Sequence, residues 1–243
     1  MFLYTSLLAV SEKTTQTVRW ISIGGVLVLL LAIALIGHFS SREQQGKMRS
    51  AKEVAFAGIC VAASFTLALL KIPTIESGGS ITIASFVPIM LYAYVFGPTK
   101  GFMVGLIHGL LNFIEDPYIL TPATFVFDYL LAFMSVGIMG FFGKLPRKEG
   151  EILPIVLGAL CVFSVRFLSH LLSGMIFFSL DSVWVSFPEW ATANAFIYSF
   201  IYQCIYVPAD ALIAIAVLTA LCKSGAFDRL VKILKTAKYD LCP

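Results

Sequence analysis

Long apolar runs separated by short polar stretches dominate the chain and predict membrane-spanning helices. One uninterrupted apolar run covers residues 20–37, and six more follow at about residues 53–70, 81–97, 101–115, 123–142, 153–179 and 194–222. A helix rises about 1.5 Å per residue, so about 20 apolar residues cross a hydrocarbon core of about 30 Å. The run at 101–115 is short and lies between Gly97-Pro98 and Asp116-Pro117, so it need not cross completely.

The composition also indicates a membrane protein. The 243 residues are 59% hydrophobic and 13% charged, whereas an ordinary soluble domain carries about 25% charged residues. The five cysteines lack the spacing of a metal site or a disulfide framework, and we interpret them as small core residues or free thiols. No Walker motif or nucleotide-binding glycine loop occurs, so the chain by itself is not expected to hydrolyse a nucleotide. We therefore predict an all-α, polytopic membrane protein.

The chain divides into three parts. Residues 1–49 are an N-terminal extension, and we interpret the run at 20–37 as a retained transmembrane anchor because a cluster of cations follows it directly. Residues 50–222 contain the six remaining runs. In residues 223–243, cations recur every three residues among leucines and isoleucines, which predicts an amphipathic helix on an anionic lipid surface.

The distribution of cations predicts the orientation in the membrane. Most of the 17 Lys and Arg residues lie in the 38–52 loop, at Lys100, in the 143–151 loop and in the C-terminal tail. The loops on the opposite side hold Lys71 together with several acids. Because cytoplasmic loops carry an excess of Lys and Arg, we expect a multi-pass protein of the cell membrane with a cytoplasmic C-terminus.

Several polar side chains fall at a similar depth on different predicted helices. Counting inward from the outer helix ends places Asp128, His170, Tyr198 and Gln203 about 6–14 Å beneath the outer surface. His108 is expected in the same layer. Each group alone is compatible with a structural hydrogen bond, but together they predict a polar pocket that opens to the outside.

The residue types in this layer favour a small cationic ligand. Tyr198, Tyr202 and Tyr206 recur at helical spacing and form an aromatic stripe, which ordinary packing also explains for the last two. A buried carboxylate beside aromatic faces attracts a flat cation through charge pairing and cation–π contact. With Asp128 as the acid of the layer, a phosphate or polyanion is disfavoured. A small, aromatic, positively charged nutrient fits best.

Two further charges lie deeper in the predicted helices. Arg166 and His170 are four residues apart and therefore share one helix face. Asp210, in the last helix, falls at a depth similar to that of Arg166. An unpaired charge in hydrocarbon costs at least about 2.5–3.5 kcal/mol. We expect Arg166 and Asp210 to pair as a floor beneath the ligand site, although each is also compatible with separate backbone or water contacts.

Four groups of motifs follow one another between about residues 50 and 222. They are Gly78-Gly79-Ser80 with Pro88; Asp128-Tyr129 with Ala132-Phe133 and Gly137; Arg166, His170, Ser173-Gly174 and Phe177-Phe178; and Tyr198-Ser199, Tyr202 and Tyr206-Val207-Pro208. With these motifs in this order, the chain resembles the thiamine-specific S components (the ThiT or YuaJ family) of energy-coupling factor (ECF) transporters.

This resemblance implies a six-helix S-component bundle, here with one extra N-terminal helix, and a thiamine site near the outer face. It implies that the loop between the first two family helices closes the site, and that uptake needs a transmembrane T subunit and two ATPase subunits. Thiamine is then the transported ligand, and no enzymatic activity, cofactor, metal site or nucleic-acid partner is expected. The substrate-binding positions it implies are Asp128, Tyr129, His170, Phe178, Tyr198, Gln203, Tyr118 and Gly79.

The chain departs from the family pattern at several positions. Phe178 stands where some members have Trp, and Gln203 stands where the family usually has Asn. The small-residue face used to dock on the T subunit is interrupted by Ile59. That face is formed here by Ala51, Ala55, Gly58 and Ala62.

Two other functions stay open. The nearer is an S component for another vitamin, such as riboflavin or a pyrimidine precursor of thiamine, because these share the fold. The more distant is an intramembrane enzyme using Asp128, His170 or Asp210 as acid and base. Against the enzyme, no nucleophile, metal-ligand pair or second carboxylate accompanies Asp128 at its depth.

Overall fold

The computed structural model describes residues 51–73, 79–117, 121–179, 187–188, 190, 192 and 194–239. The anchor helix expected at 20–37 lies outside these residues. The described chain is almost entirely helical, with one short pair of strands. The helices are α2 (Ala51–Leu69), α3 (Phe86–Phe96), α4 (Pro98–Glu115), α5 (Pro122–Phe125), α6 (Ala132–Met134), α7 (Met139–Phe142), α8 (Leu153–Ser179), α9 (Ala195–Lys223) and α10 (Ala226–Tyr239).

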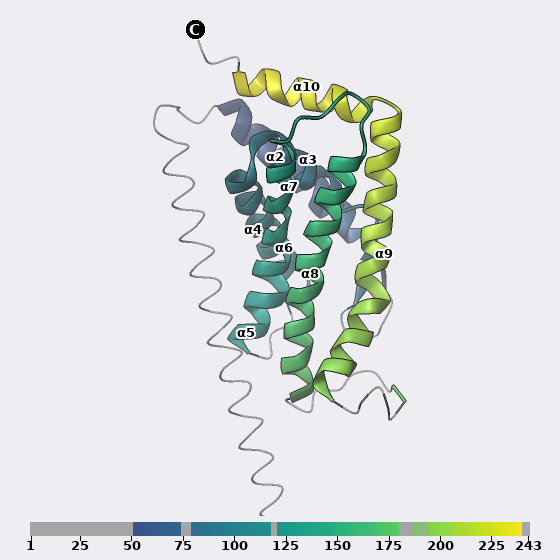
Figure 1. The fold of residues 1–243 in the computed structure, drawn as a ribbon. Coiled ribbons are helices and arrows are strands. Elements are labelled where there is room, and N and C mark those ends of the chain that lie inside the picture. The colour runs from purple at the N-terminus through teal and green to yellow at the C-terminus, as the bar shows by residue number, and fades with distance from the viewer. Residues whose placement is uncertain are drawn as a thin grey trace, which may run out of the picture.

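Four helical segments of the described chain are long and apolar enough to cross a membrane. They are Ala51–Leu69, Pro122–Phe142, Leu153–Ile176 and Ala195–Lys223. In Figure 1, α8 and α9 run side by side through the length of the molecule, and α10 lies across one end of the bundle. The predicted all-α, polytopic membrane architecture is therefore confirmed.

The segment at 81–97 is not the continuous spanning helix that its apolar run predicts. It begins with strand β2 (Ser80–Thr82), which pairs antiparallel with β1 (Lys71–Pro73). The chain then turns through Ala84, whose φ of 56° is a strained left-handed conformation for a residue other than glycine. Only the eleven residues of α3 are helical, which is a rise of about 16 Å, or about half the hydrocarbon core.

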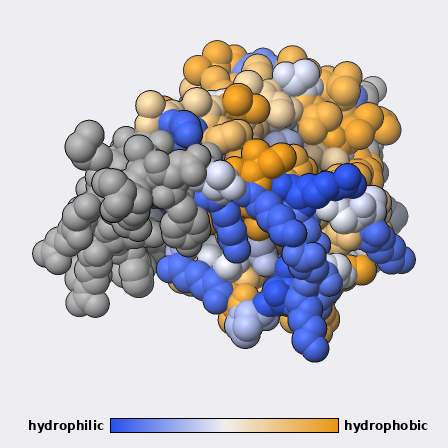
Figure 2. Space-filling view, turned by 90° about the horizontal axis from the view of Figure 1, so that it is seen from above, coloured by the Kyte–Doolittle hydropathy of each residue, from blue (hydrophilic) through white to orange (hydrophobic). Residues whose placement is uncertain are grey.

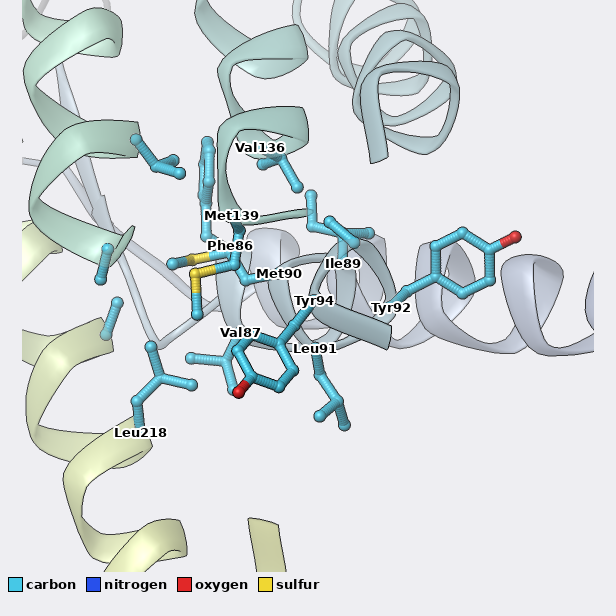
Figure 3. Packing of buried hydrophobic residues seen from close by; sticks show 14 of the residues in the cluster. Phe86, Val87, Ile89, Met90, Leu91, Tyr92, Tyr94, Val136, Met139 and Leu218 are labelled. Atoms are coloured by element: carbon cyan, nitrogen blue, oxygen red, sulfur yellow. The ribbon is translucent and has the colours of Figure 1, made fainter. Parts of the chain in front are cut away.

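Helix α3 is the centre of the apolar core. Every residue from Phe86 to Phe96 except Pro88 is buried, as expected for a helix that is hydrophobic on all sides. Figure 3 shows its side chains packed among Val136, Met139 and Leu218, which come from later segments of the chain. Irregular backbone is tolerated at membrane depth only where protein surrounds it. The end of the turn before α3 meets this condition, because Ala84 and Ser85 are buried.

The helix from Pro122 to Phe142 changes its winding along its length. It contains a π-helix at Val126–Leu131 and a 3₁₀ segment at Ser135–Ile138. Glycines of α4 allow this irregular helix to approach closely. A methyl group at Gly109 would lie 2.1 Å from the carbonyl oxygen of Tyr129, and one at Gly105 would lie 2.4 Å from that of Phe133. Small residues at a spacing of four are typical of such contacts between membrane helices.

The C-terminal tail forms an amphipathic helix. The chain leaves α9 through Gly225, whose φ of 68° suits glycine, and enters α10. Phe227, Val231 and Leu234 of α10 are buried against the bundle. Its cations Arg229, Lys232 and Lys235 are exposed, and Figure 2, which looks down on this end, shows hydrophilic side chains gathered there beside hydrophobic ones.

Candidate functional site

The π-helix places Asp128 against α8. Its carboxylate oxygen Oδ1 lies 2.8 Å from His170 Nδ1, and Oδ2 accepts a hydrogen bond from the Ser173 hydroxyl. The Asp128 side chain is 20% exposed and that of His170 is 11% exposed. We call Asp128, His170 and Ser173 the carboxylate cluster. π-helical turns within α-helices occur frequently at functional sites.

Polar contacts on both sides of α8 hold this cluster in place. The Ser169 hydroxyl donates to the Phe127 carbonyl at 2.6 Å and joins α8 to the π-helix. On the other side, the Ser199 hydroxyl donates to the Leu171 carbonyl at 2.7 Å. Gly174 allows this approach, because a methyl group there would lie 2.2 Å from the Ser199 oxygen. The cluster is therefore fixed by two packed interfaces.

Gln203 of α9 lies beside the cluster. Its side-chain nitrogen donates to the His170 carbonyl at 3.2 Å. Its buried Oε1 has no hydrogen-bond partner among the described residues. A buried acceptor without a donor costs about 1–3 kcal/mol. Gln203 therefore has an unsatisfied buried acceptor next to the backbone of His170.

The expected pair of Arg166 and Asp210 is confirmed. Arg166 Nη1 donates to Asp210 Oδ2 at 2.8 Å, and the two side chains are 7% and 2% exposed. The guanidinium carbon lies 4.4 Å from the centre of the Phe86 ring and 5.4 Å from that of Phe133. The buried cation thus has a carboxylate partner and two aromatic faces, which offset part of its desolvation.

The expected tyrosine stripe forms on α9. The Tyr206 ring packs edge-on against the His170 ring, with 6.0 Å between centroids. Tyr202 lies between Tyr206 and Tyr198, at 6.0 Å and 6.3 Å. The buried Tyr198 also contacts Phe187. The stripe therefore leads away from the carboxylate cluster along α9.

Tyr129 points in a different direction from Asp128. Its hydroxyl donates to the Asp116 carbonyl at 2.6 Å, and its ring packs against Phe113 and Phe125. His108 was expected in the layer of Asp128, but its ring instead packs edge-on against Phe86 and Phe133. These are the two rings that the Arg166 guanidinium contacts. His108 therefore belongs to the surroundings of Arg166, because α4 turns that side chain toward α3.

The remaining expected positions are placed only in part. Tyr118 and the side chain of Phe178 lie outside the described residues. Gly79 is buried directly before β2. The sequence predicts no role for Ser169 or Thr82. Ser173 enters only as part of a motif shared with the family. Helical spacing was the available signal for the serines, because positions 166, 169, 170 and 173 share one face of α8.

An exposed ion cluster joins the strand pair to the end of α4. The Lys71 ammonium lies 3.0 Å from Glu115 Oε1 and 3.2 Å from Asp116 Oδ2. Partial burial alone lowers the pKa of Lys71, but the hydrogen bonds to the two carboxylates outweigh it and the pKa is raised. This cluster fixes the start of β1 at the end of the molecule opposite α10.

The carboxylate cluster has the chemistry of a cation-binding site. Its partly exposed carboxylate and its imidazole lie near the aromatic ring of Tyr206 and the side chain of Gln203, whose amide oxygen has no partner among the described residues. Among the described residues, no group of three or more His, Cys, Asp and Glu side chains is placed to hold a metal ion. The arrangement suits an organic cation with a hydrogen-bond donor.

Comparison with known proteins agrees with this chemistry. The Thia_YuaJ family, described as thiamine transporter protein, matches residues 54–227. The thiamine transporter ThiT of Bacillus subtilis (strain 168) is 30% identical over 156 residues, which are 61% of this chain and 77% of that protein.

A solved structure of ThiT from Listeria monocytogenes has the same fold, with a TM-score of 0.63 at 21% identity. The match covers 74% of this chain and 96% of the Listeria chain. The family is one of transport proteins and not of enzymes. Because the family match extends over most of the sequence and includes the carboxylate cluster, the chain belongs to the Thia_YuaJ family of thiamine transporter proteins.

Proposed function

We propose that the protein binds thiamine at the carboxylate cluster and is the substrate-binding S component of an ECF-type transporter. The observation that carries the proposal is the Asp128 carboxylate, held by His170 and Ser173 in a largely buried position within a thiamine transporter family. A carboxylate in such a site interacts with a cation more strongly than one exposed to water.

The chemistry of thiamine matches the groups that line the site. Its thiazolium ring is a flat cation, which suits the charge of Asp128 and the tyrosine faces. Its aminopyrimidine carries an amino group, and the unpartnered Gln203 Oε1 is an acceptor for it. We propose further contacts by Tyr129, Tyr198, Gly79, Tyr118 and Phe178, in which Phe178 stacks against one of the rings.

We further propose that a T subunit docks on α2 and that two ATPase subunits supply the energy. Ala51, Ala55, Gly58 and Ala62 are exposed along α2. Glycine inside a helix is about 1 kcal/mol less favourable than alanine. No described atom lies within 4 Å of a methyl group at Gly58, so packing within the described chain does not require glycine there. Glycine at this position would allow the backbone of a partner helix to approach α2 closely.

The proposed location is the cell membrane, with α10 and the C-terminus on the cytoplasmic side in contact with anionic lipid. The cation-rich segments support it, because α10 and the 143–151 loop meet through Arg147–Asp228 and Lys232–Glu149 contacts. Cytoplasmic segments carry an excess of Lys and Arg. The carboxylate cluster then opens toward the opposite, external side.

Equilibrium dialysis of labelled thiamine against the purified protein tests the proposed ligand. We expect saturable binding that excess riboflavin does not displace. Asp128→Asn should weaken binding by about 1.5–3 kcal/mol, the range for a hydrogen bond to a charged group, or about 10–150-fold. Glu149→Gln, which changes an exposed acid near α10, is the matched control and should bind normally. Riboflavin binding, or unchanged thiamine affinity in folded Asp128→Asn, would contradict the assignment.

A further inference from the structure

Four ionisable side chains form a continuous chain of contacts through the protein. Asp128 Oδ1 contacts His170 Nδ1 at 2.8 Å, and His170 Nε2 lies 3.4 Å from Arg166 Nε. Arg166 Nη1 contacts Asp210 Oδ2 at 2.8 Å. These contacts link the carboxylate cluster to the buried pair of Arg166 and Asp210, and His170 lies between that pair and Asp128.

The contact with Arg166 determines the protonation of His170. Arg166 Nε always carries a hydrogen and can only donate, so His170 Nε2 must accept. The imidazole proton is therefore on Nδ1 and donates to Asp128. A second proton on Nε2 would point at the Arg166 donor and place two cations in contact. The hydrogen-bond geometry thus assigns Nδ1 as the donor and Nε2 as the acceptor of His170 while Arg166 is in place.

Asp210 has two separate tasks in this arrangement. Its Oδ2 pairs with Arg166, and its Oδ1 accepts hydrogen bonds from the backbone and side chain of Thr82, at 2.7 Å and 3.0 Å. The Thr82 backbone donor, at the end of β2, is thereby satisfied inside the protein. The Asp210 charge also cancels the charge of Arg166, which would otherwise repel a cation bound at Asp128.

We infer that Arg166 and Asp210 are positioning residues that keep the negative charge of Asp128 available to a cationic ligand. Arg166 excludes a proton from His170, and Asp210 neutralises and orients Arg166. With both in place, the four groups carry one net negative charge, which one monovalent cation balances. This inference rests on the proposed function, because the cation is taken to be thiamine.

If Arg166 and Asp210 served only to stabilise the fold, their replacement would have a different effect on thiamine binding. Replacing a buried ion pair by apolar residues often leaves stability unchanged or increased, whereas removing one partner is strongly destabilising. Arg166→Leu and Asp210→Leu should each destabilise the protein. The double variant should recover much of this loss, but not the part due to the Thr82 backbone donor, which still lacks its acceptor. If the pair served only the fold, the recovered double variant would also bind thiamine normally.

The double variant should instead remain defective in binding. Without Arg166, His170 can accept a second proton and neutralise Asp128. Among the described residues, the charged or titratable groups that then remain around His170 are Asp128 from the π-helix and Tyr206 from α9, with His108 of α4 beyond Phe86 and Phe133. We expect thiamine affinity at least about tenfold below wild type. It should fall further as the pH decreases from about 8 to about 6, where a histidine gains its proton.

The experiment measures thermal unfolding, thiamine affinity over this pH range, and ¹⁵N NMR spectra of the histidine rings, with His170→Gln used to assign the His170 signals. In the ligand-free wild type, Nδ1 of His170 should carry a proton and Nε2 should carry none over the whole pH range. A protonated Nε2 in the wild-type protein would by itself overturn the inference. Wild-type affinity and pH profile in the recovered double variant would overturn it as well. Wild-type protein with the expected NMR signals but no thiamine binding would refute the proposed ligand, and with it the cation on which the inference rests.

Discussion

At the scale of single residues, function and close packing meet in the π-helix. Asp128 faces α8, while the neighbouring carbonyl of Tyr129 lies against Gly109 of α4. This contact is so close that only glycine, which has no side chain, fits at position 109. A π-helix is less favourable than an α-helix and persists where its surroundings support it. The absence of a side chain at Gly109 is therefore part of what places the carboxylate.

This close contact predicts a different cost for alanine at two helical glycines. Gly109→Ala would place a methyl group 2.1 Å from a backbone oxygen, and it should destabilise the protein by about 1–3 kcal/mol, as overpacking does. In α2, Gly58→Ala meets no described atom within 4 Å and should be neutral or stabilising by up to about 1 kcal/mol. Thermal unfolding of both variants in detergent checks this, and equal effects would contradict it.

At the scale of elements, α10 is attached to the 143–151 loop by two ion pairs of different character. Arg147 and Asp228 are 7% and 14% exposed, and Asp228 also accepts from the Gly150 backbone at 3.0 Å. The guanidinium lies 5.2 Å from the centre of the Phe227 ring. The second pair, Lys232 and Glu149, is 68% and 73% exposed. Only the first pair is sheltered from solvent and salt.

We therefore expect Asp228→Ala to loosen α10. The change leaves the sheltered Arg147 without its carboxylate and should cost about 1–3 kcal/mol, the penalty for an unsatisfied buried group. Hydrogen exchange of the α10 amides should accelerate in this variant. Glu149→Ala removes the exposed pair and should leave both stability and exchange unchanged. A comparable effect of the two substitutions would show that burial does not distinguish the pairs.

At the scale of the whole molecule, the fold separates charge toward its two ends. Lys71 is bound by Glu115 and Asp116 at one end, and α10 and the 143–151 loop place their cations together at the other. This separation supports the proposed orientation in the membrane, because cation-rich segments tend to stay in the cytoplasm.

Cysteine labelling tests this orientation directly. In a variant without the five native cysteines, Asp116→Cys should react with a membrane-impermeant maleimide on intact cells, because its position is exposed on the proposed outer side. Lys148→Cys, exposed in the opposite loop, should react only after the membrane is permeabilised. The reverse pattern would place the carboxylate cluster on the cytoplasmic side.

The sequence by itself determined the membrane class and most of the helices, and it singled out Asp128 and His170, which the fold brings into contact. Hydrophobic runs of sufficient length predict helices because a bilayer requires every backbone group to be paired internally. The cost of an unpaired buried charge predicts the pairing of Arg166 with Asp210 from the sequence alone. Helical spacing likewise predicted the tyrosine stripe of α9.

Tertiary structure decided the features that depend on neighbours from distant segments. Residues 81–97 are as apolar as a spanning helix, but β2 and α3 form because β1 pairs with β2 and Asp210 satisfies the Thr82 backbone. Depth counting placed His108 with Asp128, whereas the rotation of α4 directs it toward Phe86. Depth along a helix is a property of the sequence, but the direction of a side chain around the axis depends on packing. For that reason the sequence located Asp128 and His170, and only the fold connected them through Arg166 to Asp210.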